Sequence, residues 1–120
     1  MNDEKKAYLR KALDWVEKRD FREVRSVLEG YDPPLSFTSS TSQLEVQPDI
    51  TALKGGTSKS YIEVALKTDT PEETVTRWKL LSTLASMKNG QLFLLIPRGH
   101  KAFAAGLVET HSLNAKMISI

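Results

Sequence analysis

The stretch QPDITALKGGTSKSYIEVALK, residues 47–67, predicts two β-strands joined by a tight turn. Its first half, Ile50 to Leu53, is short and strand-like, and the pair Gly55-Gly56 supplies a turn of the kind that hairpins use. In the second half, alternate residues from Tyr61 to Lys67 share a face, and Glu63 lies in the middle of that run. A β-hairpin at the centre of the fold is therefore expected.

The chain after this hairpin alternates helices and strands. Thr70 is a good N-cap for a helix that Asn89-Gly90 can end. The continuously apolar run Gln91–Ile96 is typical of a buried central strand. A further helix and a closing strand are expected over residues 101–112 and 115–120. Helices that connect neighbouring strands indicate parallel pairs, so the expected fold class is α/β or mixed α+β, with a central mixed sheet flanked by helices.

Two apolar stripes precede the hairpin. The first consists of Tyr8, Leu9, Ala12, Leu13 and Val16. The second consists of Phe21, Val24, Val27 and Leu28. Both have helical spacing, and Asp20 can start the second, so one kinked helix or two packed helices are expected. Residues 35–46 are rich in serine and threonine and leave two alternatives open, a strand–turn–strand unit or a loop.

The composition bounds the class of protein. The chain has 120 residues, of which 40% are hydrophobic, and this favours a single globular domain over residues 1–120 rather than disorder. It has no cysteine, which excludes disulfides and thiolate metal sites. We see no signal peptide and no apolar run long enough for a membrane span, so a cytoplasmic location without a membrane partner is expected. The formal charge of +2 indicates a mixed, solvated surface and does not by itself indicate nucleic acid.

The order of these elements, with Pro48-Asp49 opening one strand and Glu63 on the next, resembles the PD-(D/E)xK nuclease superfamily, which includes restriction endonucleases and Holliday-junction resolvases. The resemblance covers most of the chain and implies a restriction-endonuclease-like fold. It also implies a Mg²⁺- or Mn²⁺-dependent endonuclease that hydrolyses phosphodiester bonds of DNA, often as a homodimer. Mg²⁺ prefers oxygen ligands. The implied ligands are the carboxylates of Asp49 and Glu63 and the backbone carbonyl of Val64.

The lysine of the family motif is displaced in this sequence. It is expected two residues after Glu63, where Ala65 stands. Lys67 is the nearest substitute, because the two-residue period of a strand keeps it on the face of Glu63, about 6.6 Å beyond Ala65. Lys79 in the following helix is a further candidate. The catalytic set implied by the resemblance is therefore Asp49, Glu63 and Lys67.

Other assignments stay open. The family often uses an acidic residue from the first helix, and Glu17, Glu23 and Glu29 are available. The alternative function is a nuclease-fold module without catalysis that binds nucleic acid or a protein partner; the missing motif lysine and the modest net charge favour it. His100 and His111 have no acidic partner at a useful spacing, so both are expected at the surface.

Overall fold

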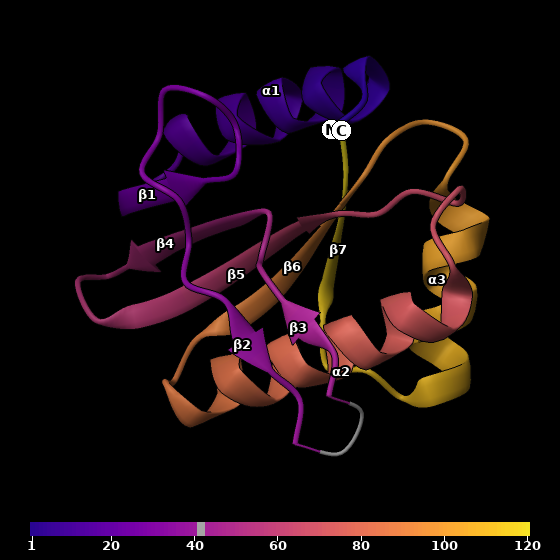
Figure 1. The fold of residues 1–120 in the computed structure, drawn as a ribbon. Coiled ribbons are helices and arrows are strands. Elements are labelled where there is room, and N and C mark those ends of the chain that lie inside the picture. Colours follow the sequence, from indigo (N-terminus) through magenta and orange to yellow (C-terminus); the bar gives the residue numbers. More distant parts are fainter. Residues whose placement is uncertain (41–42) are drawn as a thin grey trace.

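The central sheet of the computed structural model has five strands in the order β1-β4-β5-β6-β7 (Figure 1). The strands are β1 (Phe21–Ser26), β4 (Ile50–Lys54), β5 (Ser58–Val64), β6 (Gln91–Ile96) and β7 (Lys116–Ser119). β1, β4 and β5 pair antiparallel, whereas β5, β6 and β7 pair parallel. A second, small sheet joins β2 (Phe37–Thr38) to β3 (Glu45–Val46). The structure describes residues 1–40 and 43–120.

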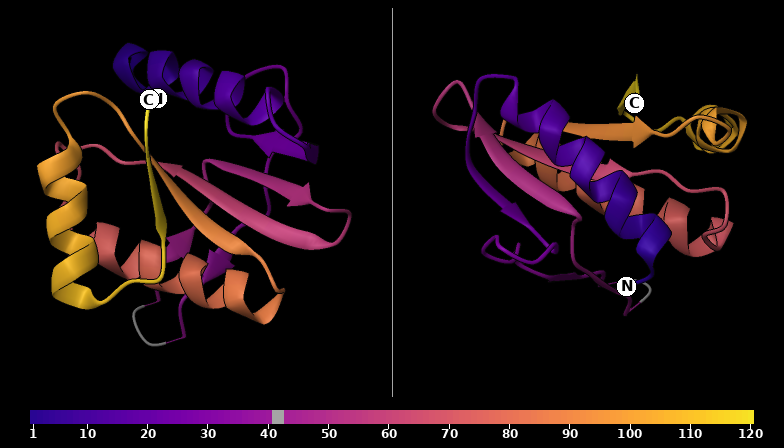
Figure 2. Two further views of the ribbon diagram at one scale, coloured as in Figure 1. Left: turned by 180° about the vertical axis from the view of Figure 1, so that it is seen from behind. Right: turned by 90° about the horizontal axis from the view of Figure 1, so that it is seen from above.

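Three helices flank this mixed sheet, which confirms the predicted fold class. They are α1 (Asp3–Glu17), α2 (Pro71–Met87) and α3 (Lys101–His111). α1 lies on one face of the sheet, and α2 and α3 lie on the other (Figure 2). The sheet grows in one direction from β5 to β7, so both crossover helices fall on the same face. In the described part of the chain, no helix is long and apolar enough to cross a membrane.

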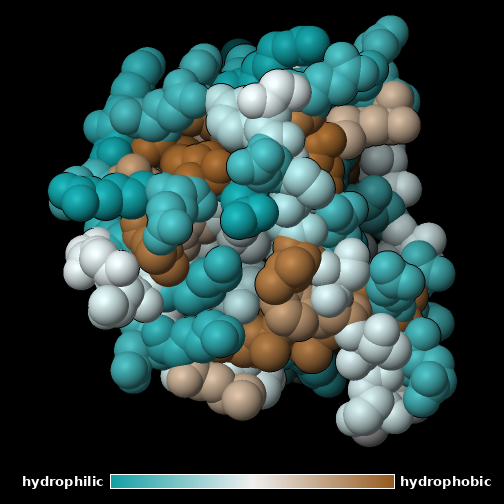
Figure 3. Space-filling view, turned by 60° about the vertical axis from the view of Figure 1, so that its left-hand side comes forward, coloured by the Kyte–Doolittle hydropathy of each residue, from teal (hydrophilic) through white to brown (hydrophobic). Residues whose placement is uncertain are grey.

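A hydrophobic layer fills each side of the sheet. Leu9 and Leu13 of α1 pack with Ile62 of β5 on one side, and Trp78 of α2 packs with Tyr61 of β5 on the other. Neighbouring residues of β5 thus serve different layers, because successive strand side chains point to opposite faces. Burying each leucine contributes about 1.5–3 kcal/mol. On the face shown in Figure 3, hydrophobic side chains form separate patches divided by hydrophilic ones.

The hairpin predicted over residues 47–67 is confirmed, with shifted bounds. β4 pairs antiparallel with β5, and Gly55 and Gly56 have positive φ angles of 63° and 92° in the turn between them. Such angles suit glycine, which has no Cβ to clash. β5 begins before the predicted strand and ends at Val64, so Lys67 lies beyond the strand.

The predicted second helix is wrong, because the segment after α1 forms β1 and Asp20 starts no helix. β1 carries a bulge at Glu23, which has a φ of 50°, and its register with β4 shifts there. The extra residue returns Phe21 and Val24, three apart, to one face, where both pack on the layer under α1. The bulge therefore gives the apolar residues of this strand a spacing that is typical of a helix.

The serine- and threonine-rich stretch forms the strand–turn–strand alternative where the structure describes it. Phe37 of β2 pairs with Val46 of β3, and both pack on the α2 side of the sheet. Residues 41 and 42 of this stretch lie outside the described residues. The other predicted helices and strands are confirmed, and Thr70 is the N-cap of α2, although its side chain makes no capping hydrogen bond.

Gly90, between α2 and β6, passes directly against the backbone of β5. A Cβ added to Gly90 would overlap the carbonyl oxygen of Lys59, which cannot turn away as a side chain can. We expect Gly90→Ala to lower the free energy of unfolding by about 3 kcal/mol, measured by urea denaturation. Gly106→Ala in α3 is the matched control, since nothing lies within 4 Å of its added Cβ. It should raise stability by about 0.5–1 kcal/mol, and similar effects from both changes would contradict the close approach.

Candidate functional site

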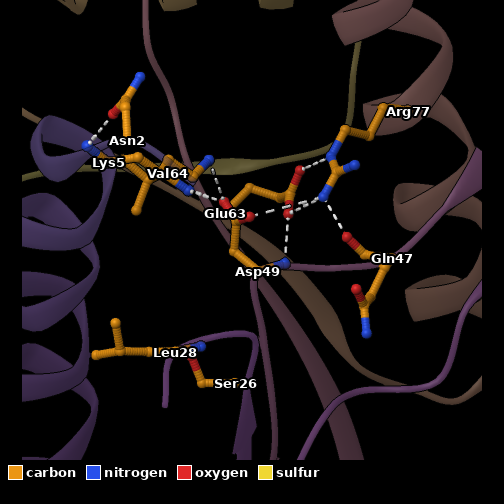
Figure 4. Close-up of polar contacts among 9 residues, drawn as sticks. All are labelled: Asn2, Lys5, Ser26, Leu28, Gln47, Asp49, Glu63, Val64 and Arg77. Carbon is orange, nitrogen blue, oxygen red and sulfur yellow. Dashed lines mark hydrogen bonds and ion pairs between the residues drawn. The ribbon is translucent and has the colours of Figure 1, made fainter.

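The register of the hairpin brings two carboxylates together. Ile50 of β4 lies opposite Ile62 of β5, so Asp49, one residue earlier, meets Glu63, one residue later. The backbone N–H of Asp49 donates to Glu63 Oε2 at 2.8 Å, and the N–H of Val64 donates to Asp49 Oδ2 at 2.9 Å (Figure 4). Each carboxylate is therefore oriented by the backbone of the neighbouring segment.

Both carboxylates are almost completely buried. The exposed fraction is 5% for Asp49 and 2% for Glu63. A buried charge without partners is costly, so these acids need compensating groups. Two basic side chains supply them, Lys5 from α1 and Arg77 from α2, and Figure 4 shows them on opposite sides of the acidic pair.

Lys5 binds Asp49 from the first turn of α1. Its Nζ lies 3.0 Å from Asp49 Oδ2. The turn is capped by the Asn2 side chain, which accepts a hydrogen bond from the backbone N–H of Lys5. Burial alone would lower the pKa of Lys5, but the negative charges of Asp49 and Glu63 outweigh it and raise that pKa overall. The site therefore holds a protonated ammonium group beside Asp49.

Arg77 binds Glu63 as a fork. Its Nε donates to Glu63 Oε1 and its Nη2 donates to Glu63 Oε2 at 3.0 Å. The same Nη2 donates to the carbonyl oxygen of Gln47 and lies 3.7 Å from Asp49 Oδ1. Burial alone would lower the pKa of Arg77, but the charges of Glu63 and Asp49 raise it overall. Arg77 is therefore a permanent cation that contacts both acids.

Glu63 is the most deeply buried charge of the site. Burial raises the pKa of Glu63 and the nearby charge of Asp49 raises it further, while Arg77 and Lys5 act in the opposite direction. Its two oxygens receive three N–H donors, one from Asp49 and two from Arg77. An arrangement of donors alone suits the ionised carboxylate, which is an acceptor only.

These groups line a cavity of about 440 Å³. Its lining includes five carboxylates and two cations. The carboxylates are Glu45, Asp49, Glu63, Asp69 and Glu73, and the cations are Lys5 and Arg77. The cavity is therefore acidic, although the net charge of the chain is +2.

The donor atoms of this site fit a hard divalent cation. Carboxylate and carbonyl oxygens meet at Asp49, Glu63 and Gln47, and no imidazole or sulfur is among the cavity-lining side chains of the described residues. This is the chemistry that Mg²⁺ and Mn²⁺ favour. Within residues 1–40 and 43–120, no group of three acidic or histidine side chains can hold an ion together. A metal here would therefore need backbone oxygens and waters in addition to the two acids.

Of the residues proposed from the sequence, Asp49, Glu63 and the backbone of Val64 come together, whereas Lys67 does not join them. Lys67 is exposed, lies three residues beyond the end of β5, and is not among the residues lining the cavity. The strand period that assigned it to the face of Glu63 does not continue past Val64. Ala65, at the motif position, is buried in the layer under α2.

His100 is the partner of Lys67. The backbone N–H of Lys67 donates to His100 Nδ1 at 2.9 Å, and the imidazole packs edge-on against Tyr8 at 5.8 Å between ring centroids. With an exposed fraction of 7%, His100 is buried, so its predicted surface position is wrong. His111 is exposed, as predicted.

The remaining sequence candidates lie away from the cavity. Glu17 accepts a hydrogen bond from Tyr31, Glu23 stands at the bulge of β1, Glu29 lines a different hollow, and Lys79 is exposed on α2. α1 therefore brings a lysine to the site and not an acid.

Sequence reasoning missed Lys5 and Arg77, although each had a signal. Lys5 lies one helical turn before Leu9 and so extends the buried stripe of α1 with a charged residue. Arg77 directly precedes the buried Trp78 and follows Glu73 by one turn. A charge that continues an apolar stripe indicates a buried partner, but the sequence does not name that partner.

Comparisons of this chain with protein-family models, with curated proteins and with solved structures give no match. The geometry and chemistry of the site itself are therefore what indicates the function of this chain.

The raised pKa of Glu63 makes stability depend on pH. The folded protein holds this proton more tightly than the unfolded chain, in which glutamate titrates near about 4.3. The group therefore favours folding below that pH, and this contribution is lost as pH rises through the folded pKa. Glu63→Gln removes it, because glutamine does not titrate.

We expect wild type to lose stability relative to Glu63→Gln as the pH rises above the unfolded pKa of about 4.3, by about 1.4 kcal/mol for each unit that the pKa of Glu63 is raised. Urea denaturation at several pH values measures this difference. Glu73→Gln at the exposed rim of the cavity is the control for removing a carboxylate. Parallel pH curves for wild type and Glu63→Gln would contradict the raised pKa of the buried Glu63 carboxyl.

Proposed function

We propose that this chain is a Mg²⁺- or Mn²⁺-dependent endonuclease that hydrolyses phosphodiester bonds of DNA. The observation that carries the proposal is the convergence of the Asp49 and Glu63 carboxylates in one cavity, with Lys5 Nζ 3.0 Å from Asp49 Oδ2. The order of elements around that pair agrees with the resemblance: a helix, three antiparallel strands, a helix and a parallel strand.

In this proposal Asp49 and Glu63 would hold the metal ion, together with the backbone carbonyl of Val64 and water. When bound, the ion would supply positive charge for the phosphorane-like transition state and would lower the pKa of a bound water. The backbone N–H groups of Asp49 and Val64 keep the two carboxylates in their orientation. Each carboxylate is thus fixed before substrate arrives, which is the condition for electrostatic stabilisation.

Lys5 takes the role that the resemblance gave to Lys67. Its ammonium contacts Asp49 and is part of the cavity lining, whereas Lys67 lies outside it. An ammonium in this position can bind a phosphate oxygen or orient water beside Asp49. The support for this exchange is proximity: Lys5 is far from Asp49 in sequence, but the packing of α1 brings it within hydrogen-bonding distance.

A second function is favoured by Arg77. Lys5 and Arg77 balance the charges of Asp49 and Glu63, and both oxygens of Glu63 are already bonded. Such a site is complete without a metal. It suits a nuclease-fold module without catalysis that binds nucleic acid or a protein partner.

DNA cleavage distinguishes these functions. We expect purified protein to cleave supercoiled plasmid, branched DNA or single-stranded DNA with Mg²⁺ or Mn²⁺, and not with EDTA. Asp49→Asn and Glu63→Gln should abolish cleavage, and Lys5→Met should slow it about 100-fold, the size of effect typical of a positioned acid–base group. Lys11→Met, an exposed lysine of the same helix, is the control and should leave the rate unchanged.

The cleavage results decide between Lys5 and Lys67, and between a nuclease and a module without catalysis. Loss of cleavage in Lys67→Met with full activity in Lys5→Met would return the lysine role to Lys67. Cleavage that persists in Asp49→Asn and in Glu63→Gln would contradict the nuclease proposal. A wild-type protein that neither cleaves DNA nor binds Mn²⁺ would favour the module without catalysis.

The proposal includes a homodimer in the cytoplasm. A chain that measures 31 × 31 × 23 Å has little surface with which to enclose a DNA duplex, and resembling nucleases often work in pairs. The lack of cysteine suits a reducing compartment. Light scattering should give a mass twice the 13.5 kDa of one chain. A single-chain mass at high concentration would remove the homodimer from the proposal.

A further inference from the structure

The guanidinium of Arg77 is surrounded by oxygen atoms. It donates to Glu63 Oε1, Glu63 Oε2 and the Gln47 carbonyl oxygen, and it lies 3.7 Å from Asp49 Oδ1 (Figure 4). Three of these four atoms belong to carboxylates and one to a backbone carbonyl. This is also the ligand set that a hard divalent cation prefers. We call these four atoms the oxygen cage.

Arg77 and a metal ion cannot use the oxygen cage at the same time. Glu63 Oε2 already accepts from the N–H of Asp49 and from Arg77 Nη2, which uses both of its in-plane lone pairs. A divalent ion on the same oxygens would also lie within a few ångströms of the guanidinium charge, where repulsion in a buried site is strong. Metal binding therefore requires Arg77 to leave Glu63.

The structure offers Arg77 another position. Its side chain is 29% exposed and borders the cavity of about 440 Å³, so it can swing outward without unfolding α2. Glu73 lies four residues earlier on the same helix, is exposed, and lines the same cavity. Residues four apart on a helix are neighbours on its surface, so Glu73 can pair with the released guanidinium.

We propose that Arg77 is an internal competitor for the metal: it fills the oxygen cage in the metal-free protein and must be displaced before a divalent cation binds. The inference rests on the proposed metal-dependent function and deepens it by naming the residue that sets metal occupancy. In the metal-free protein Arg77 stabilises the buried carboxylates. Once it is displaced, their oxygens are free for the metal ion on which the proposed activity depends.

Calorimetric titration with MnCl₂ tests the competition. Wild type, Arg77→Met and the control Lys79→Met are stripped of metal with EDTA and titrated at about pH 8, where carboxylates are ionised. Arg77→Met should bind Mn²⁺ about tenfold more tightly than wild type, the gain expected when a binding-competent state populated at about 10% becomes the only state. Lys79→Met removes one exposed positive charge from the same helix and should bind as wild type does. Equal or weaker binding by Arg77→Met would overturn the proposal.

Arg77→Lys keeps the inference testable if Arg77→Met does not fold. Lysine retains the charge but lacks the planar fork, so it holds fewer oxygens of the cage. The Mn²⁺ affinity of Arg77→Lys should exceed that of wild type. It should fall below that of Arg77→Met wherever Arg77→Met can be measured. An Arg77→Lys affinity equal to that of wild type would then count against competition. Circular dichroism establishes which variants are folded.

The wild-type protein gives an independent readout. The Nε–H resonance of Arg77, identified by its loss in Arg77→Lys, should be protected from solvent exchange in the metal-free protein, because Nε donates to Glu63. Saturating Mg²⁺ should shift this resonance and speed its exchange together with changes at the amide of Val64. A Mg²⁺-induced change at Val64 with an unchanged Arg77 resonance would overturn the displacement.

Failure of the inference and failure of the proposed function are distinguishable. If wild type binds Mn²⁺ and cleaves DNA while Arg77→Met binds no more tightly, the competition is wrong and the metal-dependent function stands. If Arg77→Met binds Mn²⁺ and wild type does not, the competition is supported and the nuclease activity of wild type fails. If no variant binds Mn²⁺, both proposals fail.

Discussion

The buried carboxylate of Glu63 is the constraint on which the arrangement of this protein depends. A charge with an exposed fraction of 2% needs partners that the hairpin alone does not provide. Arg77 reaches it from α2, the backbone of Asp49 reaches it from the position just before β4, and Lys5 reaches Asp49 from α1. One cluster of charges therefore ties helices on both faces of the sheet to the central hairpin.

The ion pairs of this cluster stabilise the fold but oppose the proposed binding of a metal. Removing one partner from a buried ion pair typically costs about 3–5 kcal/mol, because the other charge is left uncompensated. The bonds that avoid this cost also occupy the oxygens of Glu63 that a metal would use. In the proposal made above, the balance between the ion-pair network and the proposed metal site would lie with Arg77, whose guanidinium would exchange Glu63 for Glu73, four residues earlier on α2.

Local patterns predicted most of the fold, and their failures have physical causes. The glycine turn, the apolar run of β6 and the start of α2 after Thr70 each depend on neighbouring residues, and each is confirmed. The bulge at Glu23 gave β1 the spacing of a helix, because its extra residue returns Phe21 and Val24 to one face. The assignment of Lys67 assumed that a strand continues past Val64, where the pairing of β5 ends.

The sequence by itself determined the hairpin and the convergence of Asp49 and Glu63, since Asp49 directly precedes β4, Glu63 lies on β5, and the register of these adjacent strands follows from a short turn. Only the tertiary structure decided which cations meet them. Lys5 is 44 residues from Asp49, and Arg77 lies on a helix that packs across a different face of the sheet. Contacts of this kind depend on how helices dock on the sheet, and no periodicity along the chain encodes that docking.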